Sequence, residues 1–482
     1  MKTDKKIFRC FIKTLSPLYI GCDEIYEPMG FVIDETAKQM IVFDPISFFG
    51  QMKKEDKERF SKICLKGTPS SILEIYKFLK GRKAEGRRID VCGGFIEHYQ
   101  KTLSISVKDE KKIQQELNRF IIERTSFNPY DNRPYIPGSS VKGAIRTAYL
   151  NAMQQLKKIE KGSVRDAKDL EKSLLDWDKR GYDKIENDPF RLVKVSDFMP
   201  VGELKTKIVY AVNQKKKPSE FSARGIAQIL EVIEPGAIFQ GEIVIEQPEK
   251  EAGILKPVSL DNLLKSIALF YTKERKREDL ELNHLGISNF SVASDSLLIR
   301  IGRHSGAESI TIDGHRHIKI TGKRGEVPKY LDHATTLWLI SEMPNPRDIS
   351  NLKPMGWVEL DKLTSESEDK FKNQEQAWKD KRETEIKTRD TAVKTEDVKE
   401  SRKQEPVPQK PLSALEKLLK ELEVVKAGDM GRIGTFVQKI ETLETDADKG
   451  ALAKAVKEKM GQKQFKSYKR KEYLQGLIEK AK

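Results

Sequence analysis

Cysteine and histidine are scarce in this sequence. Its 482 residues include six histidines and four cysteines, and Cys10, Cys22, Cys64 and Cys92 form no Cys-x-x-Cys pair. So few and so widely spaced thiols exclude a small secreted scaffold held by disulfides, and they offer no ligand set for a structural zinc ion. The sequence therefore predicts a reduced cytoplasmic protein that carries no cofactor.

Long hydrophobic runs are also absent. The first six residues are mostly polar, and they lead into a stretch from Ile7 to Thr14 in which apolar and polar residues alternate. No run approaches the roughly 20 apolar residues that a membrane-spanning helix needs, and there is no apolar core of a secretory signal. We therefore expect no membrane partner, and the alternation itself predicts a β-strand.

Acidic residues are outnumbered by basic ones. The sequence has 89 Lys and Arg residues against 74 Asp and Glu residues, which gives a formal net charge of +15. An excess of this size favours a polyanionic partner, and nucleic acid is the usual one. The net charge favours one class of partner over others, but it does not identify a binding site. The candidate binding residues must therefore be found from sequence motifs.

Turn signals and hydrophobic periodicity divide the chain into four segments. Residues 1–189, with a helical insertion, and 190–360 are both strand-rich, which predicts an α+β fold of two ferredoxin-like (RRM-like) halves. Residues 361–411 are rich in charge and poor in apolar side chains, which predicts a charged linker that is partly helical at most. Helical periodicity returns in 412–482, where 16 basic and 11 acidic residues predict a small, basic, all-α domain.

The motif from Tyr135 to Arg146 is Tyr-Ile-Pro-Gly-Ser-Ser-Val-Lys-Gly-Ala-Ile-Arg. An apolar pair, a Pro-Gly turn and two hydroxyl residues precede an apolar-periodic segment, which predicts a strand, a tight turn and a capped helix start. Free backbone N–H groups at such a start favour an anion. Two interpretations follow: an ordinary capped helix with solvated side chains, or a phosphate-binding turn. The second assigns the RNA contacts to Gly138, Ser139, Ser140, Lys142 and Arg146.

A second glycine-containing loop follows a predicted strand near residue 300. Glycines permit close approach to the backbone and basic side chains supply positive charge, so this loop is a candidate phosphate cradle. A Gly-x-x-x-Gly turn between strands is more often only a turn, and both interpretations stay open. The candidate RNA-binding residues are Arg300, Gly302, Arg303, His304 and Gly306.

Three consecutive lysines lie in the connection before the turn at Pro235 and Gly236. Lys215, Lys216 and Lys217 predict a basic hairpin tip. Such a tip would contact either RNA or a neighbouring subunit.

Two acidic residues provide the only argument for catalysis. Asp23 and Glu24, in the segment from Gly21 to Glu27, would orient a metal ion or act as a general base for RNA cleavage. Acidic loop residues are usually solvated, so we expect a protein that is not an enzyme. The alternatives are a metal-dependent endoribonuclease and an adaptor whose basic surface binds only proteins.

Four stretches taken together resemble the RAMP superfamily of CRISPR-associated proteins. They are Leu15–Gly21, Tyr135–Arg146, Glu234–Ile243 and the loop from Gly302 to Gly306. The Pro-Gly-Ser-Ser-x-Lys-Gly core is highly specific to the superfamily, and the order of the stretches is most similar to the fifth-subunit family of type III-A (Csm) effector complexes. The resemblance covers about residues 6–360 and leaves 361–482 outside the family pattern.

The resemblance implies a non-catalytic RNA-binding subunit of a ribonucleoprotein complex in antiviral defence. Such a subunit caps the backbone filament, holds the 3′ part of the guide RNA (crRNA) and supports crRNA maturation. Its implied partners are guide RNA, the neighbouring backbone RAMP subunit, the small subunit and trimming nucleases. Slicing relatives carry a catalytic Asp after the first Ile-Gly; Asp23 and Glu24 stand there, but Ile25-Tyr26-Glu27-Pro28 departs from the slicing pattern.

Overall fold

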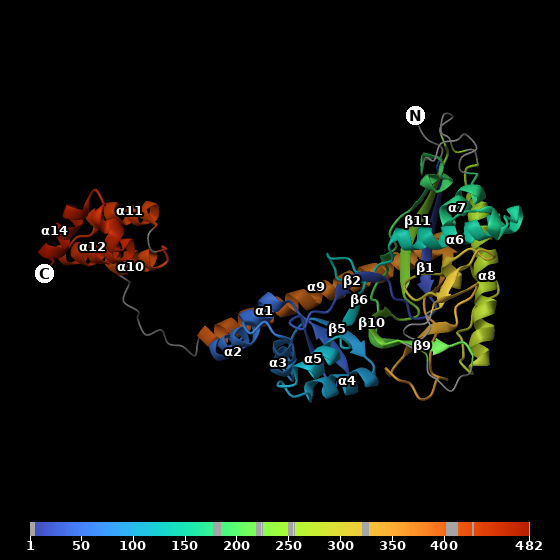
Figure 1. Cartoon of the computed structure of the whole chain (residues 1–482), viewed down its shortest axis with the longest axis horizontal. Helices are drawn as coiled ribbons and strands as arrows, with labels where there is room; N and C mark the ends of the chain where they lie inside the picture. Colours follow the sequence, from blue (N-terminus) through green and yellow to red (C-terminus); the bar gives the residue numbers. More distant parts are fainter. Residues whose placement is uncertain are drawn as a thin grey trace. The chain divides into compact units, whose positions relative to one another are not determined.

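The structure of the protein is a computed structural model. It describes residues 5–176, 185–217, 223, 225–248, 254, 256–320, 327–401, 413–426 and 429–481, of which 386–401 by their backbone only. The chain divides into two compact units, Met1–Thr384 and Glu385–Lys482, and each is described by itself (Figure 1). Among the described residues, no helix is long and apolar enough to cross a membrane.

Six strands form the first sheet of the larger unit, with β1 (Lys5–Thr14) at its centre. β1 is antiparallel to both of its neighbours, β11 (Ile238–Glu246) and β16 (Trp357–Lys362). The remaining strands are β12 (Leu298–Arg300) on β16, and β7 (Val193–Val195) and β8 (Met199–Pro200) on β11.

The alternation predicted for the first strand is confirmed. In β1, Cys10, Ile12 and Thr14 are buried, whereas Arg9 and Lys13 are exposed. Burial of every second side chain is what a strand with one face on the core requires. The buried face therefore fixes which side of the sheet carries the hydrophobic core.

Two long helices pack on the buried face of this sheet. They are α6 (Gly138–Lys157) and α8 (Leu260–His284), which also pack against each other (Figure 1). The shared core contains Val141, Ile145, Ile267, Phe239 and Val358, all essentially inaccessible to solvent. α6 thus presents its apolar stripe to the sheet, which leaves its other faces for polar contacts.

Eight strands form the second sheet, in the order β2-β6-β10-β9-β5-β4-β3 with β15 on β9. The sheet is mixed: β6 is parallel to β10 and β5 is parallel to β9, while the other pairs are antiparallel. Its strands are β2 (Gly21–Ile25), β3 (Phe31–Asp34), β4 (Gln39–Val42), β5 (Arg87–Val91), β6 (Ile122–Thr125), β9 (Thr206–Lys215), β10 (Gln228–Ile233) and β15 (Thr336–Ser341).

Shorter elements complete the larger unit. Phe95 of α4 and Phe120 after α5 join the core of the second sheet, where their rings stack 5.3 Å apart. The helices are α1 (Pro45–Gly50), α2 (Lys54–Cys64), α3 (Pro69–Leu79), α4 (Gly93–Leu103), α5 (Glu110–Leu117) and α7 (Ala167–Leu174). Four 3-10 turns, Lys161–Ser163, Ile185–Asn187, Pro189–Leu192 and Glu308–Ile310, and a hairpin of β13 (Ile318–Ile320) and β14 (Lys329–Leu331) are also present.

The α+β class is confirmed, but the two predicted halves do not form separate sheets. β1, from the predicted half 1–189, lies between two strands of the predicted half 190–360. The second sheet likewise joins β6 to β10 and β5 to β9 across the predicted boundary. The boundary is wrong as a division of sheets, because strands find their hydrogen-bond partners across the whole chain.

The predicted linker 361–411 requires a correction. Residues Ser365–Ser401 form one helix, α9, and its first part belongs to the larger unit. The buried Phe371 ring meets Phe11 edge to face at 5.1 Å, and Arg133 Nη1 lies 2.8 Å from Glu375 Oε2. Sparse apolar residues on one stripe are enough to dock a helix that composition alone assigns to a linker. Residues 402–412 lie outside the described residues.

The described residues of the second unit beyond 413 are helical. Its helices are α10 (Ala414–Glu423), α11 (Met430–Lys439), α12 (Asp446–Met460), α13 (Gln462–Lys466) and α14 (Lys471–Lys480), with a 3-10 turn at Ile440–Thr442. They enclose a separate hydrophobic core that includes Ile433, Phe436, Leu452, Val456 and Leu474. Ser413 opens α10 with a capping box, in which its side chain and that of Glu416 each accept a backbone N–H.

Candidate nucleic-acid interface

A groove of about 530 Å³ brings together the motif after Tyr135, the loop after Arg300 and the segment at Gly21. The three segments are far apart in the sequence and meet because α6 packs beside β12 and the loop after β12 lies on residues 19–21. The lining residues are Ile20, Gly21, Asp23, Ser139, Ser140, Gly143, Ala144, Thr147, Arg300, Ile301, Gly302, Arg303, Ser305 and Ile310.

The first backbone N–H of α6 already has a hydrogen-bond partner within the protein. Pro137, not a serine, is the N-cap, and the Gly138 N–H donates to Asp197 Oδ1 at 2.8 Å. A β-carbon on Gly138 would lie only 2.3 Å from the Val195 carbonyl oxygen, so this position requires glycine. The expectation that Gly138 faces a phosphate is therefore wrong, because Asp197 already occupies that end of the helix.

The two serines of the motif do face the groove. Ser139 is exposed and Ser140 is half-buried, and neither hydroxyl has a hydrogen-bond partner among the described residues. The two serines do not cap α6 as predicted, because the N-cap residue is Pro137 and the Asp197 side chain accepts the first N–H of the helix. Their hydroxyls are consequently available as donors to a ligand.

Arg146 is part of the fold rather than of the groove. Its guanidinium donates to Asp188 Oδ2 at 2.9 Å and to Glu171 Oε2 at 2.7 Å. Two carboxylates neutralise a single cation and use its directional donors, so these contacts do not support the predicted role of Arg146 in holding phosphate. The sequence motif gave no sign of these partners, because they lie on later segments.

Lys142 lies on the same side of α6 as Arg146 and does not line the groove. It is half-buried, and it forms no ion pair with a carboxylate of the described residues. Burial, and next the positive charge of Lys194, lower the pKa of the Lys142 ammonium. A cation without a partner beside other cations favours an anion, which keeps Lys142 a candidate contact at the margin of the groove.

Gly302 places the second loop against the segment before β2. Its φ is +89°, and a β-carbon would lie 2.4 Å from the Tyr19 carbonyl oxygen. That same oxygen accepts the Arg303 N–H at 3.0 Å. Gly306 also has a positive φ of +85°, but there a β-carbon would meet nothing closer than 3.6 Å. The two glycines thus shape the loop, and Gly302 does so through close contact of two backbones.

The basic residues of this loop have different roles. Arg300 is buried and pairs with Glu278 at 2.6 Å, so the expectation that it binds phosphate is wrong. Arg303 is the cation that the groove exposes: its side chain is 47% exposed and has one partner, Glu123, at 3.0 Å. A single exposed ion pair is weak, so a phosphate can compete for this guanidinium.

His304 is also a structural residue. Its Nε2 lies 2.7 Å from Gln228 Oε1, and its ring packs on Trp338 with centroids 4.4 Å apart. Burial, and next the charge of Arg303, lower the pKa of His304 to about 4. The ring is therefore neutral near pH 7 and supplies no charge to the groove, which corrects the prediction for this residue.

The three lysines do not form an exposed tip. Lys215 is half-buried at the end of β9, where it pairs in register with Thr336. Lys216 is buried and lies 2.5 Å from Glu308 and 2.9 Å from Glu281, so its predicted RNA or subunit contact is wrong. Lys217 is exposed and keeps its status as a candidate contact.

The two candidate catalytic residues are on a strand and not in a loop. Asp23 and Glu24 are exposed on β2, whose pairing with β6 is irregular between Gly21 and Ile25. Asp23 has a left-handed φ of 59° and lines the groove; Glu24 does not. Among the described residues, no group of three or more His, Cys, Asp or Glu side chains is placed to hold a metal ion.

Sequence reasoning missed Gly143 and Thr147 as groove residues. Their spacing from Ser139 is four residues at each step, which places all three on one face of a helix. A β-carbon on Gly143 would meet nothing within 4 Å, so the helix exposes its backbone to the groove at this point. The periodicity was available in the sequence, but no local signal distinguished this face from a solvated one.

The groove combines hydroxyl donors, an accessible backbone and one exposed guanidinium. Such groups bind phosphate and sugar oxygens, and they do not discriminate among bases. Asp23 is the one acidic residue that lines the groove among the described residues. The chemistry therefore suits a sugar–phosphate backbone.

Comparisons with known proteins agree on one superfamily. The family model described as RAMP superfamily matches residues 11–439. The chain is 27% identical over 243 residues to the "CRISPR system Cms protein Csm5" of Streptococcus thermophilus, and 25% identical over 214 residues to the protein of the same name from Methanocaldococcus jannaschii. These matches cover 48% and 42% of this chain and only 64% and 46% of the relatives.

Two solved structures are also similar. One is a chain of a Csm–crRNA–target RNA ternary complex in a type III-A CRISPR-Cas system, determined by cryo-electron microscopy. It is 20% identical with a TM-score of 0.45, and the match covers 74% of this chain and 100% of that one. The other is the crystal structure of T. onnurineus Csm5, 20% identical with a TM-score of 0.42, covering 72% of this chain and 99% of that one.

Proposed function

The chain belongs to the RAMP superfamily, and from this premise we propose that it is a non-catalytic RNA-binding subunit of a type III-A CRISPR (Csm) effector complex. The relatives in Streptococcus and Methanocaldococcus are both named Csm5, which supports this subunit rather than another. The groove is the observation that carries the proposal. There the first turns of α6, which belong to the motif after Tyr135, meet the glycine-containing loop after Arg300, and both segments were predicted from the sequence.

In the proposed complex the protein caps the backbone filament and holds the 3′ part of the crRNA. It supports crRNA maturation and so contributes to antiviral defence in the cytoplasm. Its partners are crRNA, the neighbouring backbone RAMP subunit, the small subunit and trimming nucleases. The net charge of +15 supports RNA as the principal partner, since it favours association with a polyanion.

The groove would bind RNA through its backbone. Ser139 and Ser140 donate hydrogen bonds to phosphate oxygens, Arg303 exchanges Glu123 for phosphate, and Gly143 lets the strand approach the helix. Lys142 and Lys217 are exposed or half-buried cations outside the groove that extend its positive field. Binding of this kind depends strongly on salt and weakly on sequence.

A charge series at Gly143 tests this role. Gly143→Glu adds a carboxylate to the groove, Gly143→Gln adds the same bulk without charge, and Gly143→Lys adds a cation, all at a position with free space. We expect RNA affinity of the full chain to fall in the order Lys, Gln, Glu, with Glu at least about tenfold weaker than Gln. Gly50→Glu on α1, another exposed helical glycine with free space and outside both proposed RNA surfaces, is the matched control. Equal affinity of the Glu and Gln variants would reject the groove as the RNA site.

A metal-dependent endoribonuclease that uses Asp23 is the rival function. The position of Asp23 in the groove supports it, because a carboxylate near a bound phosphodiester can hold a divalent cation. Purified protein incubated with labelled RNA and magnesium or manganese distinguishes the two. Cleavage that Asp23→Asn abolishes and Glu24→Gln leaves intact would favour the enzyme; intact RNA in all three proteins is the result we expect.

A protein-only adaptor is the remaining alternative. RNA that co-purifies with the isolated chain and is released by high salt would count against it, because release by salt is typical of phosphate contacts.

A further inference from the structure

The charges of the second unit are sorted along its sequence. Residues 413–448 include five basic and eight acidic side chains, whereas residues 449–471 include nine basic side chains and one acidic side chain, Glu458. The basic segment covers most of α12, all of α13 and the start of α14. The later part of this unit, from Lys449 to Lys471, is therefore strongly positive.

The cations of the α13–α14 region have no acidic partners in the described part of the chain. Lys463, Lys466, Lys469 and Arg470 are exposed, and none of them forms an ion pair with a described carboxylate. Gathered like charges repel one another, and the positive end of α14, which no side chain caps, lies among them. An external polyanion would remove this repulsion.

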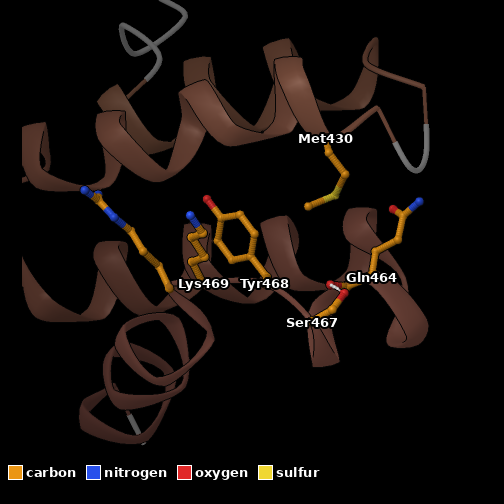
Figure 2. Close-up of a pocket in the computed structure, with 6 residues that line it drawn as sticks. Met430, Gln464, Ser467, Tyr468 and Lys469 are labelled. Atoms are coloured by element: carbon orange, nitrogen blue, oxygen red, sulfur yellow. Dashed lines mark hydrogen bonds between the residues drawn. The ribbon is translucent and has the colours of Figure 1, made fainter.

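A hollow of about 400 Å³ opens beside these cations. Figure 2 shows the Met430 thioether from α11 and the Tyr468 ring pointing into the same space, with Lys469 next to the ring. Gln464 and Ser467 form the polar rim, where Ser467 Oγ donates to the Gln464 carbonyl oxygen at 3.1 Å. A volume of this size is within the range of small-ligand sites.

We propose that this surface is a second binding site for single-stranded RNA, separate from the groove of the larger unit. One base stacks on the half-buried Tyr468 ring against Met430, while Lys466, Lys469 and Arg470 contact the flanking phosphates. Cations around an accessible aromatic ring are the combination that binds single strands without sequence preference. An acidic peptide would satisfy the charges, but its Asp and Glu residues carry no aromatic ring for the hollow, whereas every nucleotide carries a base, so RNA is the better fit.

The second site goes beyond the proposed function, which needs only the groove. Both units belong to one chain, so an RNA strand held by one unit is present at high effective concentration for the other. The gain in affinity requires no contact between the units. An RNA that is too short to reach both sites would not show this gain in affinity.

A charge-reversal pair tests the second site in the full-length protein. Lys469→Glu with Arg470→Glu should weaken binding of an oligouridine by about tenfold and reduce the slope of log affinity against log salt by about 1.4, because each phosphate contact contributes about 0.7 to a single strand. Lys417→Glu with Lys420→Glu on α10 is the matched control, since both lysines are exposed and the change in charge is identical. The control should bind within about twofold of the wild type.

The aromatic ring is tested independently. Tyr468→Ala should weaken binding by about fivefold or more, whereas Tyr468→Phe, which keeps the stacking face, should bind like the wild type. If the charge-reversal variant binds oligouridine with unchanged affinity and an unchanged salt slope, the proposal is overturned. This holds even if the variant no longer binds a protein partner, because the surface would then be a protein-binding site. If Gly143→Glu weakens RNA binding and the charge reversal does not, the groove is supported as an RNA site and the second site is rejected. If only the charge reversal weakens RNA binding, the groove is rejected and the second site is supported.

Discussion

The Arg300 guanidinium lies 2.6 Å from the Glu278 carboxylate, in a place where the two side chains are 2% and 0% exposed. The Trp357 indole N–H also donates to Glu278, at 2.5 Å, and Arg300 Nε donates to the Met355 carbonyl oxygen at 3.1 Å. This network joins α8, β12 and β16 directly before the loop that carries Gly302. The groove therefore depends on a buried ion pair, of which Arg300 is also one of the lining residues.

Replacing Glu278 should be costly. Glu278→Ala leaves the buried Arg300 without its counter-charge, and the free energy of unfolding should fall by about 3–5 kcal/mol. Urea denaturation of the full chain measures this loss. Glu203→Ala is the control, because its pair with Lys381 is 62% and 55% exposed and should contribute about 0–1 kcal/mol. Similar losses in the two variants would contradict the structural role of Arg300.

The two loop glycines should differ in their response to alanine. Both have positive φ, so each Gly→Ala change should cost about 1–2 kcal/mol of backbone strain. Gly302→Ala should cost more than Gly306→Ala, because only its β-carbon would overlap backbone, at 2.4 Å from the Tyr19 carbonyl oxygen. Unfolding free energies of the two variants measure the difference. An equal or larger loss for Gly306→Ala would show that the loop does not rest on Tyr19 in this way.

Stability should fall in acid because of His304. Burial and the nearby Arg303 hold its pKa at about 4 in the folded protein, well below its unfolded value. The unfolded state therefore binds the proton first, so this contribution to stability is complete above about pH 6.5 and is lost as the pH falls towards 4. With allowance for partial exposure, the loss is about 2 kcal/mol.

His304→Asn isolates that contribution. Asparagine does not titrate and tolerates the left-handed φ of 66° at this position. Between about pH 7 and pH 4, the wild type should lose about 2 kcal/mol more of unfolding free energy than the variant does. Parallel pH profiles of the two proteins would show that His304 is not held neutral by the fold.

The sequence was most informative where a local pattern decides the structure. Alternation in Ile7 to Thr14 predicted β1, and the Pro-Gly turn after Tyr135 predicted the start of α6 within three residues. The glycines at 302 and 306 were identified as special, and both have positive φ. Each of these features depends on neighbours in the sequence, so a short window contains the relevant physics.

Ion-pair partners could not be predicted in the same way. Arg146 meets Asp188 from 42 positions away, and Lys216 meets Glu308 from 92 positions away. A basic side chain in a motif looks the same whether a carboxylate from another element neutralises it or not. Two of the predicted phosphate ligands, Arg146 and Arg300, and one predicted RNA or subunit contact, Lys216, form ion pairs within the fold for this reason. Only the fold distinguishes them from Arg303.

Local sequence patterns also could not predict which strands pair with each other. The Cys10 thiol of β1 donates to the Gly241 carbonyl oxygen of β11, 231 positions away. Alternation identifies a strand but not its neighbours, so the chain was divided into sequential halves that the sheets do not respect. Similarly, Phe371 and Glu375 dock the first part of α9 although the segment's composition predicts a linker.

Photocrosslinking tests the central claim most directly. A guide RNA that carries 4-thiouridine in its 3′ part is assembled with the full chain and the other complex subunits, irradiated, and mapped by peptide sequencing. The groove predicts crosslinked peptides that contain residues 139–147 and 300–305, and Gly143→Glu should remove both while Gly50→Glu should not. Crosslinking of this chain that leaves both segments unlabelled would contradict the assignment of the groove as an RNA-binding site.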